Sequence, residues 1–304
     1  MFNILAEGRL RLSPFEATND LWESRPFMFG LTVPREALDD EERASSVRDG
    51  IDRSIRLHSK VACLTQDWSL PEAAGDPNEL RGWAHLSLWA HYGGGHTGMC
   101  LRFDKVRLVE ALDRVGQAHR GSLHGPVSYR GTTSGTILAG VHTGWVEQYG
   151  VDAVAHEFAL LHRESVFFSK NRDWSNEAEY RMVLMSETVL PEYLDIKKAL
   201  TRVFVGDAFP KTKLPALRAV LQQYPGVAVE RVKYSKRRLT SAPLEMSDES
   251  VLLHPRVGAP HESFAARLKS LRDSNVLRNT RAGRALGPAD QGAADSSSST
   301  SVGE

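Results

Sequence analysis

Apolar residues recur along this chain with two different periods, which predict helices and strands in turn. Residues 151–168 carry their apolar side chains at the spacing of one helical face, which is typical of an amphipathic helix. That face holds Val151, Val154, Ala155, Phe158 and Leu161. Short apolar runs such as 61–65 and 200–206 are instead typical of strands. We therefore predict that the chain contains both helices and strands.

The same pattern, followed along the whole chain, gives the order of the predicted elements. Helices are predicted over 34–60, 105–118, 151–168 and 211–223, and strands over 61–65, 98–103, 126–130, 180–185, 200–206 and 227–234. A short helix end and a strand are expected over Ile4 to Leu12. The runs 61–65 and 98–103 are expected to pair antiparallel. We therefore predict an α+β fold, with a mixed or antiparallel sheet and flanking helices.

Composition changes along the chain and suggests three regions. Residues 1–235 are expected to form a single α+β domain, and 236–281 a partly helical C-terminal extension. Residues 282–304 are rich in Ser, Ala and Gly and hold few apolar side chains. Such a segment cannot offset its own ordering entropy, so we expect a disordered tail there.

Charge and cysteine content limit the classes of function. Lys plus Arg and Asp plus Glu number 38 each. This balance gives no strong signal for nucleic acid and none for an anionic membrane surface. The two cysteines are too few for a disulfide framework. The start of the chain lacks a signal peptide, and no apolar run approaches membrane-spanning length. A cytoplasmic location is expected.

The segment from Trp174 to Arg181 is the strongest candidate for chemistry. If it is extended, Glu177, Glu179 and Arg181 share one face, because side chains alternate along a strand. A carboxylate held there can accept a hydrogen bond from a sugar hydroxyl or stabilise a developing cation, with Lys170 or Arg181 setting its charge state. A salt-bridge ladder on an edge strand explains the pattern equally well.

Aromatic residues flank these charges. Trp174 and Tyr180 would wall such a site by stacking on a planar ring, but aromatics beside a strand more often pack in the core, which we favour. Trp89, His91 and Tyr92 form a second polar and aromatic segment. Three glycines follow Tyr92, and they would let the backbone approach a ligand closely. Their spacing matches no phosphate-binding loop.

Other chemistries receive less support from the sequence. The nearby side chains His85, His91, His96 and Cys100 match no standard zinc spacing, so no metal is expected. No serine lies in a hydrolase elbow. The basic run from Lys233 to Leu239 would contact a phosphate or nucleic acid, although a single short patch is usually a solvated turn.

Three motifs together resemble the prokaryotic family known as domain of unknown function 2971. Its members show Asn-Asp-x-x-Glu, then Leu-Trp-x-His-Tyr with Gly-x-Cys, then Lys-x-x-x-Trp-x-x-Glu-x-Glu-x-Arg. They occur here in that order over about residues 1 to 235, as Asn19, Asp20 and Glu23, as Leu88 to Tyr92 with Gly98 and Cys100, and as Lys170, Trp174, Glu177, Glu179 and Arg181. Members usually carry a further strand, rich in Tyr and Lys, before the segment matching Ile4 to Leu12. We therefore expect either a true start upstream of Met1 or a fold that lacks this strand.

The layout of the family is similar, more distantly, to ADP-ribosyltransferase-like domains with a split sheet. This resemblance implies that NAD is a co-substrate, that Glu179 is the catalytic glutamate and that Tyr92 or Trp89 lies near the nicotinamide. It also implies that Lys170 and Arg181 hold pyrophosphate or orient Glu179. The cleft would be lined by Asn19, Glu23, His91, Tyr92, Lys170, Glu177, Glu179 and Arg181.

Three hypotheses follow for the function. The leading one is an ADP-ribosyltransferase-like enzyme that uses NAD to modify an unknown macromolecular target in bacterial stress or phage defence. The second is a non-catalytic sensing or partner-binding module, in which the same residues form a structural network. The third is a nuclease, for which only the carboxylates are evident.

Overall fold

A computed structural model of the chain describes residues 2–18, 20, 29–32, 41–67, 80–130, 138–235 and 238–244. The chain divides into two compact units, Met1–Leu252 and Leu253–Glu304, and all the described residues belong to the first unit. Asn19 and Glu23 lie outside the described residues. So do residues 34–40 of the first predicted helix, most of 236–281, and the tail 282–304.

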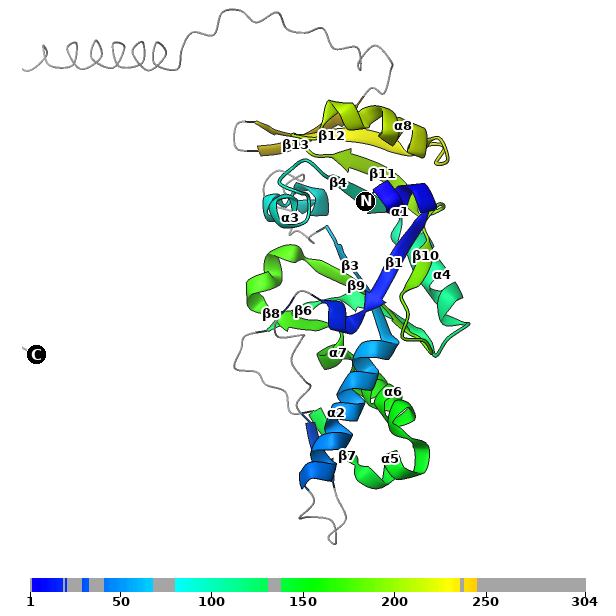
Figure 1. The fold of residues 1–304 in the computed structure, drawn as a ribbon. Coiled ribbons are helices and arrows are strands. Elements are labelled where there is room, and N and C mark those ends of the chain that lie inside the picture. Colours follow the sequence, from blue (N-terminus) through cyan, green and yellow to red (C-terminus); the bar gives the residue numbers. More distant parts are fainter. Residues whose placement is uncertain are drawn as a thin grey trace, which may run out of the picture. The chain divides into compact units, whose positions relative to one another are not determined.

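A five-stranded antiparallel sheet forms the centre of the first unit (Figure 1). Its order is β10-β1-β3-β9-β5, built from β10 (Glu192–Asp195), β1 (Arg9–Pro14), β3 (Ser59–Thr65), β9 (Glu179–Met185) and β5 (Ser122–Pro126). Every residue of β9 is buried, because strands and side chains cover it on all sides. The register sets Arg181 opposite Cys63 and Glu179 opposite Thr65. The charged end of β9 therefore lies inside the protein.

A second, four-stranded sheet has the order β13-β12-β11-β4. It contains β13 (Arg238–Pro243), β12 (Ala228–Ser235), β11 (Leu200–Val205) and β4 (Met99–Phe103). β11 and β12 are parallel and are joined through η6 (Lys211–Lys213) and the helix α8 (Leu214–Leu221), as a parallel pair requires a crossover. The other two pairings are antiparallel.

The predicted pairing of 61–65 with 98–103 is wrong, because these runs belong to different sheets. β3 pairs with β1 and β9, whereas β4 pairs with β11. Both runs are short and apolar, and such a run carries no signal for its partner. The α+β class is confirmed, with mixed and antiparallel sheets and flanking helices.

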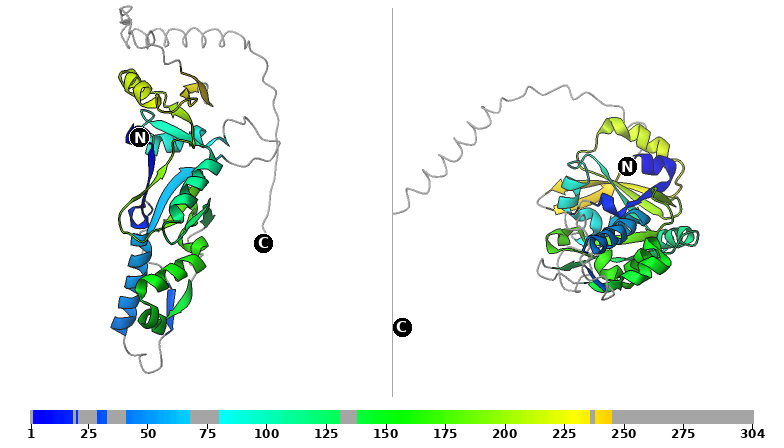
Figure 2. Two further views of the ribbon diagram at one scale, coloured as in Figure 1. Left: turned by 90° about the vertical axis from the view of Figure 1, so that its right-hand side faces the viewer. Right: turned by 60° about the horizontal axis from the view of Figure 1, so that its bottom comes forward.

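Helices cover the two sheets at separate places. The helices α2 (Glu41–His58), α5 (Thr143–Tyr149) and α6 (Val151–Leu161) pack together, as both views in Figure 2 show. Their apolar faces share a core with Phe15 and Phe167. α4 (Lys105–Gly116) packs on the five-stranded sheet through Leu108 and Leu112. α1 (Phe2–Glu7) lies against α8 over the four-stranded sheet.

Several predicted boundaries differ from the structure. The helix predicted over 151–168 ends at Leu161, and a separate short helix, α7 (Arg163–Val166), follows His162, whose backbone leaves the helical region. This break allows Phe167 and Phe168 to enter the core. The first predicted helix ends at His58, because Ser59 and Lys60 already belong to β3. The strand predicted over 126–130 is divided between β5 and β6 (Ser128–Arg130).

The remaining elements were not predicted. They include β2 (Phe29–Thr32) and β7 (Leu138–His142), which form a short parallel pair, and β8 (Ser169–Asn171), which pairs in parallel with β6. They also include α3 (Leu86–His91) and the short helices η1 (Phe15–Ala17), η4 (Gly82–Ala84) and η5 (Arg172–Glu177). The β6–β8 pair sets Lys170 opposite Tyr129 and so delivers both side chains to the charged end of β9. No helix among the described residues is long and apolar enough to cross a membrane.

Candidate functional site

A cavity of about 490 Å³ is bordered by parts of both sheets. The wall from the five-stranded sheet comes from β1, β3 and the start of β9, and the opposite wall comes from β4, η4 and α3. Most of the lining is apolar, and the charged residues Lys170, Glu177, Glu179 and Arg181 gather on one side of it. This volume lies in the range of cavities that bind cofactors and drug-sized ligands.

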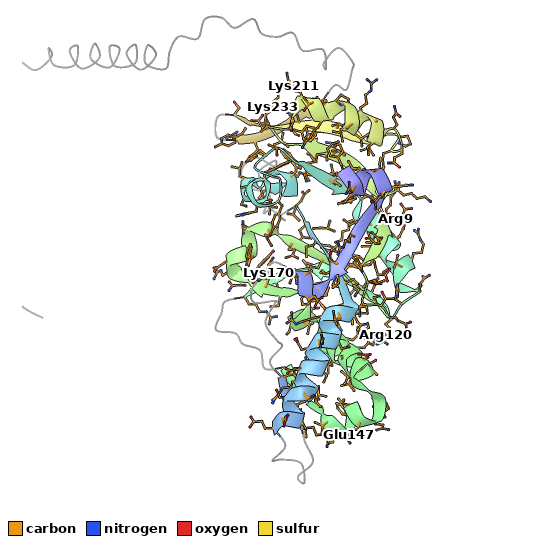
Figure 3. The ribbon with its side chains drawn as sticks, viewed as in Figure 1. Arg9, Arg120, Glu147, Lys170, Lys211 and Lys233 are labelled. Carbon is orange, nitrogen blue, oxygen red and sulfur yellow. The ribbon has the colours of Figure 1, made fainter. Side chains whose placement is uncertain are left out.

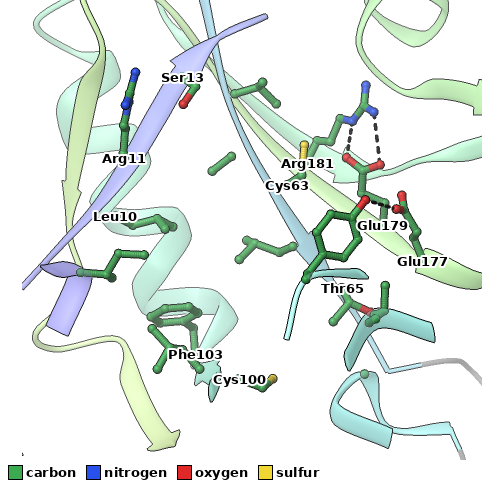
Figure 4. Close-up of a pocket in the computed structure, with 18 of the residues that line it drawn as sticks. Leu10, Arg11, Ser13, Cys63, Thr65, Cys100, Phe103, Glu177, Glu179 and Arg181 are labelled. Atoms are coloured by element: carbon green, nitrogen blue, oxygen red, sulfur yellow. Dashed lines mark hydrogen bonds and ion pairs between the residues drawn. The ribbon is translucent and has the colours of Figure 1, made fainter. Parts of the chain in front are cut away.

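Glu179 and Arg181 form a buried, two-point ion pair on one face of β9 (Figure 4). Arg181 Nε donates to Glu179 Oε1 at 2.6 Å, and Nη2 donates to Oε2 at 3.2 Å. Both side chains are almost completely buried, with 0% of the Arg181 side chain and 4% of the Glu179 side chain exposed. Arg181 Nη1 also donates to the Phe167 carbonyl at 2.8 Å. The carboxylate therefore has one fixed orientation.

Lys170 links this pair to a second carboxylate. Its Nζ donates to Glu179 Oε2 at 3.1 Å and to Glu177 Oε2 at 2.6 Å. The other oxygen of Glu177 accepts a hydrogen bond of 2.6 Å from Tyr92 Oη, and Tyr92 is half exposed. Lys170 Nζ lies 4.9 Å from the centre of the Trp174 ring, which supports the ammonium as a cation–π contact. Two carboxylates and two cations thus form one network.

The backbone around Ala178 places the two glutamates. Glu177 ends η5, and Ala178 has a φ of 45°, so the chain turns sharply before β9 begins at Glu179. The Glu179 N–H donates to Tyr129 Oη at 2.7 Å, which holds the first residue of the strand. Glu179 and Arg181 share the predicted strand face, but Glu177 reaches Lys170 from the preceding turn. The extended geometry predicted for all three residues is therefore correct only for the last two.

Electrostatics keep Glu179 ionised. Burial alone would raise its pKa, but the hydrogen bonds and charge of Arg181, with the charge of Lys170 and a hydrogen bond from Cys63, outweigh it and hold the pKa below the ordinary value. Burial raises the pKa of Tyr129 to about 12, and the nearby carboxylates act in the same direction, so its hydroxyl stays neutral. The cavity therefore faces an ionised carboxylate held between two cations, beside a neutral hydroxyl.

Six of the predicted site residues line the cavity: Trp89, Tyr92, Lys170, Glu177, Glu179 and Arg181. Trp174 does not line it but lies beneath Lys170. His91 is exposed and contacts the edge of the Tyr92 ring, and Asp20 is buried away from the lining. Tyr180 packs in the interior, as predicted, where its hydroxyl lies 2.6 Å from His124 Nδ1.

Sequence reasoning missed four residues of this region. Cys63, Arg11 and Trp83 line the cavity, and Tyr129 holds the backbone of Glu179. Arg11 and Ser13 come from β1, and Figure 4 shows them on the side of the cavity away from the carboxylates. Each of the four lies in a short run without a motif. Alternation along β1 and β3 could have suggested the side of the sheet for Arg11 and Cys63, but Trp83 in η4 and Tyr129 on β6 have no such signal.

Four possible metal ligands, His85, His91, His96 and Cys100, are close to one another in the sequence. Among the described residues, no three His, Cys, Asp or Glu side chains converge in a way that would hold an ion. Trp89 and His96 stack, with ring centres 6.2 Å apart, and Cys100 is packed near Trp89 and Phe204. Burial raises the pKa of the Cys100 thiol to about 12, so it remains protonated.

Searches of curated proteins and of solved structures give no match to this chain. One family does match over residues 88–182, which run from α3 to the start of β9. The matched segment contains the aromatic side of the cavity and all four members of the charged network. Over this segment, the chain matches the family described as "Protein of unknown function (DUF2971)".

Proposed function

We propose that the cavity is an active site in which Glu179 is the catalytic carboxylate of an NAD-dependent ADP-ribosyl transfer to a macromolecule. The observation that carries the proposal is the state of Glu179. It lines the cavity, it is ionised, and Arg181 fixes its orientation. A fixed negative charge in a site sheltered from water stabilises positive charge that develops on a sugar during the reaction.

The lining suits a dinucleotide. Trp83, Trp89 and Tyr92 offer aromatic surface to planar rings. The hydroxyl oxygens of Thr18 and Thr65 are buried on the lining and have no hydrogen-bond partner among the described residues, so a bound molecule would satisfy them. Arg11 supplies a cation at the β1 side of the cavity, away from Glu179, where an anionic phosphate would be accepted.

NAD, when bound, supplies an ADP-ribosyl group whose bond to nicotinamide breaks with the electron pair leaving on nicotinamide, while the acceptor forms the new bond and loses a proton. Glu179 provides the negative charge facing the sugar, and its remaining lone pairs accept hydroxyl hydrogen bonds. Glu177 lies beside it on the same lining and is the group to which we assign the acceptor's proton. Lys170 holds the two carboxylates together despite their like charges.

A second candidate is a binding module in which the network serves only the fold. The burial of Arg181 favours it, because its side chain is 0% exposed and donates to a backbone carbonyl as well as to Glu179. The two candidates differ in what Glu179 does for the protein. In the enzyme it faces a substrate, and in the module it only compensates Arg181.

The test compares the wild type with Glu179→Gln, which keeps the size of the side chain and removes its charge. Each protein is incubated with NAD carrying a labelled nicotinamide, together with bacterial protein and nucleic-acid fractions as acceptors. We expect nicotinamide release by the wild type and a loss of about 100-fold or more in the variant. Glu230→Gln, which alters an ion pair with Arg202 in the other sheet, serves as the control and should retain activity.

Melting temperatures of the three proteins are measured in parallel. Release that is absent from the wild type with every acceptor, or unchanged in Glu179→Gln, would rule out the enzyme. A variant that has lost its melting transition would be replaced by Tyr92→Phe, which removes only the hydroxyl that donates to Glu177.

A further inference from the structure

The four-stranded sheet carries a concentration of positive charge that the neutral chain as a whole conceals. Residues 200–244 hold nine Lys or Arg and only two Asp or Glu, although the two kinds are equal at 38 each in the full sequence. The nine are Arg202, Lys211, Lys213, Arg218, Arg231, Lys233, Lys236, Arg237 and Arg238. The proposed cavity chemistry uses none of them.

Five of these cations converge on one face at one end of the sheet. Arg231 and Lys233 lie two residues apart on β12 and project to the same side as Val229, which packs in the α8 core. Thr240 pairs with Lys233, so Arg238, two residues before Thr240 on β13, faces the same way. We call Lys211, Lys213, Arg231, Lys233 and Arg238 the basic cluster.

The loop after β11 brings η6 to this end. Arg231 lies level with Val205, the last residue of β11, and its Nη1 donates to the Asp207 carbonyl at 3.1 Å. The loop continues from there to Lys211 and Lys213, which directly precede α8. Figure 3 shows Lys211 and Lys233 beside α8 and β12, away from Arg9.

The balance of charge within the cluster remains positive. Four of its members are exposed and Arg231 is partly exposed. Asp207 is the one acid at this end among the described residues 200–235 and 238–244, because Glu230 lies on the opposite face and is paired with Arg202. An anionic partner would therefore meet several cations and one carboxylate.

We propose that the basic cluster is a docking surface for the phosphate backbone of a nucleic acid. Residues two apart on a strand are about 7 Å apart, so the cations on β12 are regularly spaced. The cations of β13 and η6 lie at the same end of the sheet. A regular polyanion can contact all of them at once and gain affinity by releasing its counterions. Contacts of this kind give orientation without sequence specificity.

A membrane or an acidic peptide suits the surface less well. Tyr234 is the exposed large hydrophobic residue among the described residues 200–244, and it belongs to the opposite face of β12 with Val232. Among the described residues, the cluster therefore offers no large apolar side chain for insertion into lipid or for anchoring a peptide. This inference goes beyond the proposed transfer reaction and does not depend on it.

The experiment measures fluorescence anisotropy of labelled 20-nucleotide single-stranded DNA, duplex DNA and RNA with the full chain, at salt concentrations from about 50 to 300 mM. The variant Lys211→Gln/Lys213→Gln/Lys233→Gln should raise Kd at least tenfold and reduce the slope of log K against log salt by about two to three, since each lost phosphate contact removes nearly one unit. The control Arg9→Gln/Lys197→Gln/Lys198→Gln removes the same charge from exposed positions and should change Kd less than twofold. Figure 3 shows Arg9 away from Lys233, and Lys197 and Lys198 precede the start of β11, whereas the cluster lies at its end.

Competition identifies the partner class. Unlabelled nucleic acid should displace the probe, whereas polyglutamate and vesicles containing phosphatidylserine, at equal total charge, should compete weakly. The proposal is overturned by an absence of binding to all three probes at low salt, by equal binding of the triple variant, or by stronger competition from polyglutamate or vesicles. All substituted residues are exposed, so the melting temperatures should be unchanged, which would confirm that the variants are folded.

Discussion

Replacing Arg181 with Met gives the most direct test of the charged network. Methionine retains most of the apolar volume but removes the guanidinium, and with it three hydrogen bonds to Glu179 and the Phe167 carbonyl. The Glu179 carboxylate would keep its contact with Lys170, which it shares with Glu177, and the hydrogen bond from Cys63. The variant therefore holds two buried carboxylates and a single ammonium.

The expected loss is large. Removing one partner from a buried ion pair costs about 3–5 kcal/mol, because the remaining charge is desolvated without compensation. At roughly 2–4 °C per kcal/mol for a domain of this size, the melting temperature should fall by about 6–20 °C. Urea unfolding followed by circular dichroism gives the free energy directly. Arg202→Met is the matched control, since its partner Glu230 is paired at a more exposed position and the cost should stay below about 1 kcal/mol.

A double variant separates loss of the pair from loss of packing. In Glu179→Gln/Arg181→Met no carboxylate remains to be compensated at position 179, so the protein should be more stable than Arg181→Met alone. Coupling between contacting residues is commonly about 0.5–3 kcal/mol. A cost of less than 1 kcal/mol for Arg181→Met, or strict additivity in the double variant, would refute the buried pair as the element that holds this end of β9.

Two further predictions concern titration and thiol reactivity. Because the pKa of Glu179 is lower in the folded protein than in the unfolded chain, its contribution to stability is complete above the ordinary glutamate pKa and is lost as the pH falls through the folded value. Urea unfolding between pH 7 and pH 3 should show this loss. The unfolding free energy should fall less steeply with decreasing pH in Glu179→Gln than in the wild type, and equal slopes would contradict the prediction. Iodoacetamide at pH 8 should modify the exposed Cys63 in the folded protein. Cys100 should react only after denaturation, because burial raises the pKa of its thiol to about 12. Mass spectrometry that finds Cys100 labelled before Cys63 in the native protein would contradict this prediction.

Hydrophobic periodicity predicted the interior strands better than their neighbours. The run at 180–185 is apolar except for Arg181, and the structure buries it between β3 and β5. The spacing and the kind of residues within the run are enough to predict such a strand. Pairing depends on contacts with distant residues, and so 61–65 and 98–103, which look alike, belong to different sheets.

The charged side of the site was predictable because its residues are close in sequence, and the rest was not. Lys170, Glu177, Glu179 and Arg181 occur within a short segment, and residue chemistry alone indicated that they interact. Tyr129 and Arg11 arrive from other strands, and no local pattern marks them. The turn at Ala178 was missed for a related reason, since a positive φ at alanine is set by its surroundings and not by its own preference.

The sequence of the Glu177 to Arg181 segment is compatible with two interpretations, a salt-bridge ladder and a functional site. The structure shows why both can hold. Arg181 faces the interior and binds Glu179 on both oxygens, as a structural pair would. Lys170 and Tyr92 approach from the cavity side and bring Glu177 into the same network. A carboxylate anchored on its buried side is preorganised on its open side, because its orientation and charge are fixed before a ligand arrives. Loss of stability on removing Arg181 would therefore support this arrangement, whereas nicotinamide release by Glu179→Gln decides whether the open side is used for chemistry.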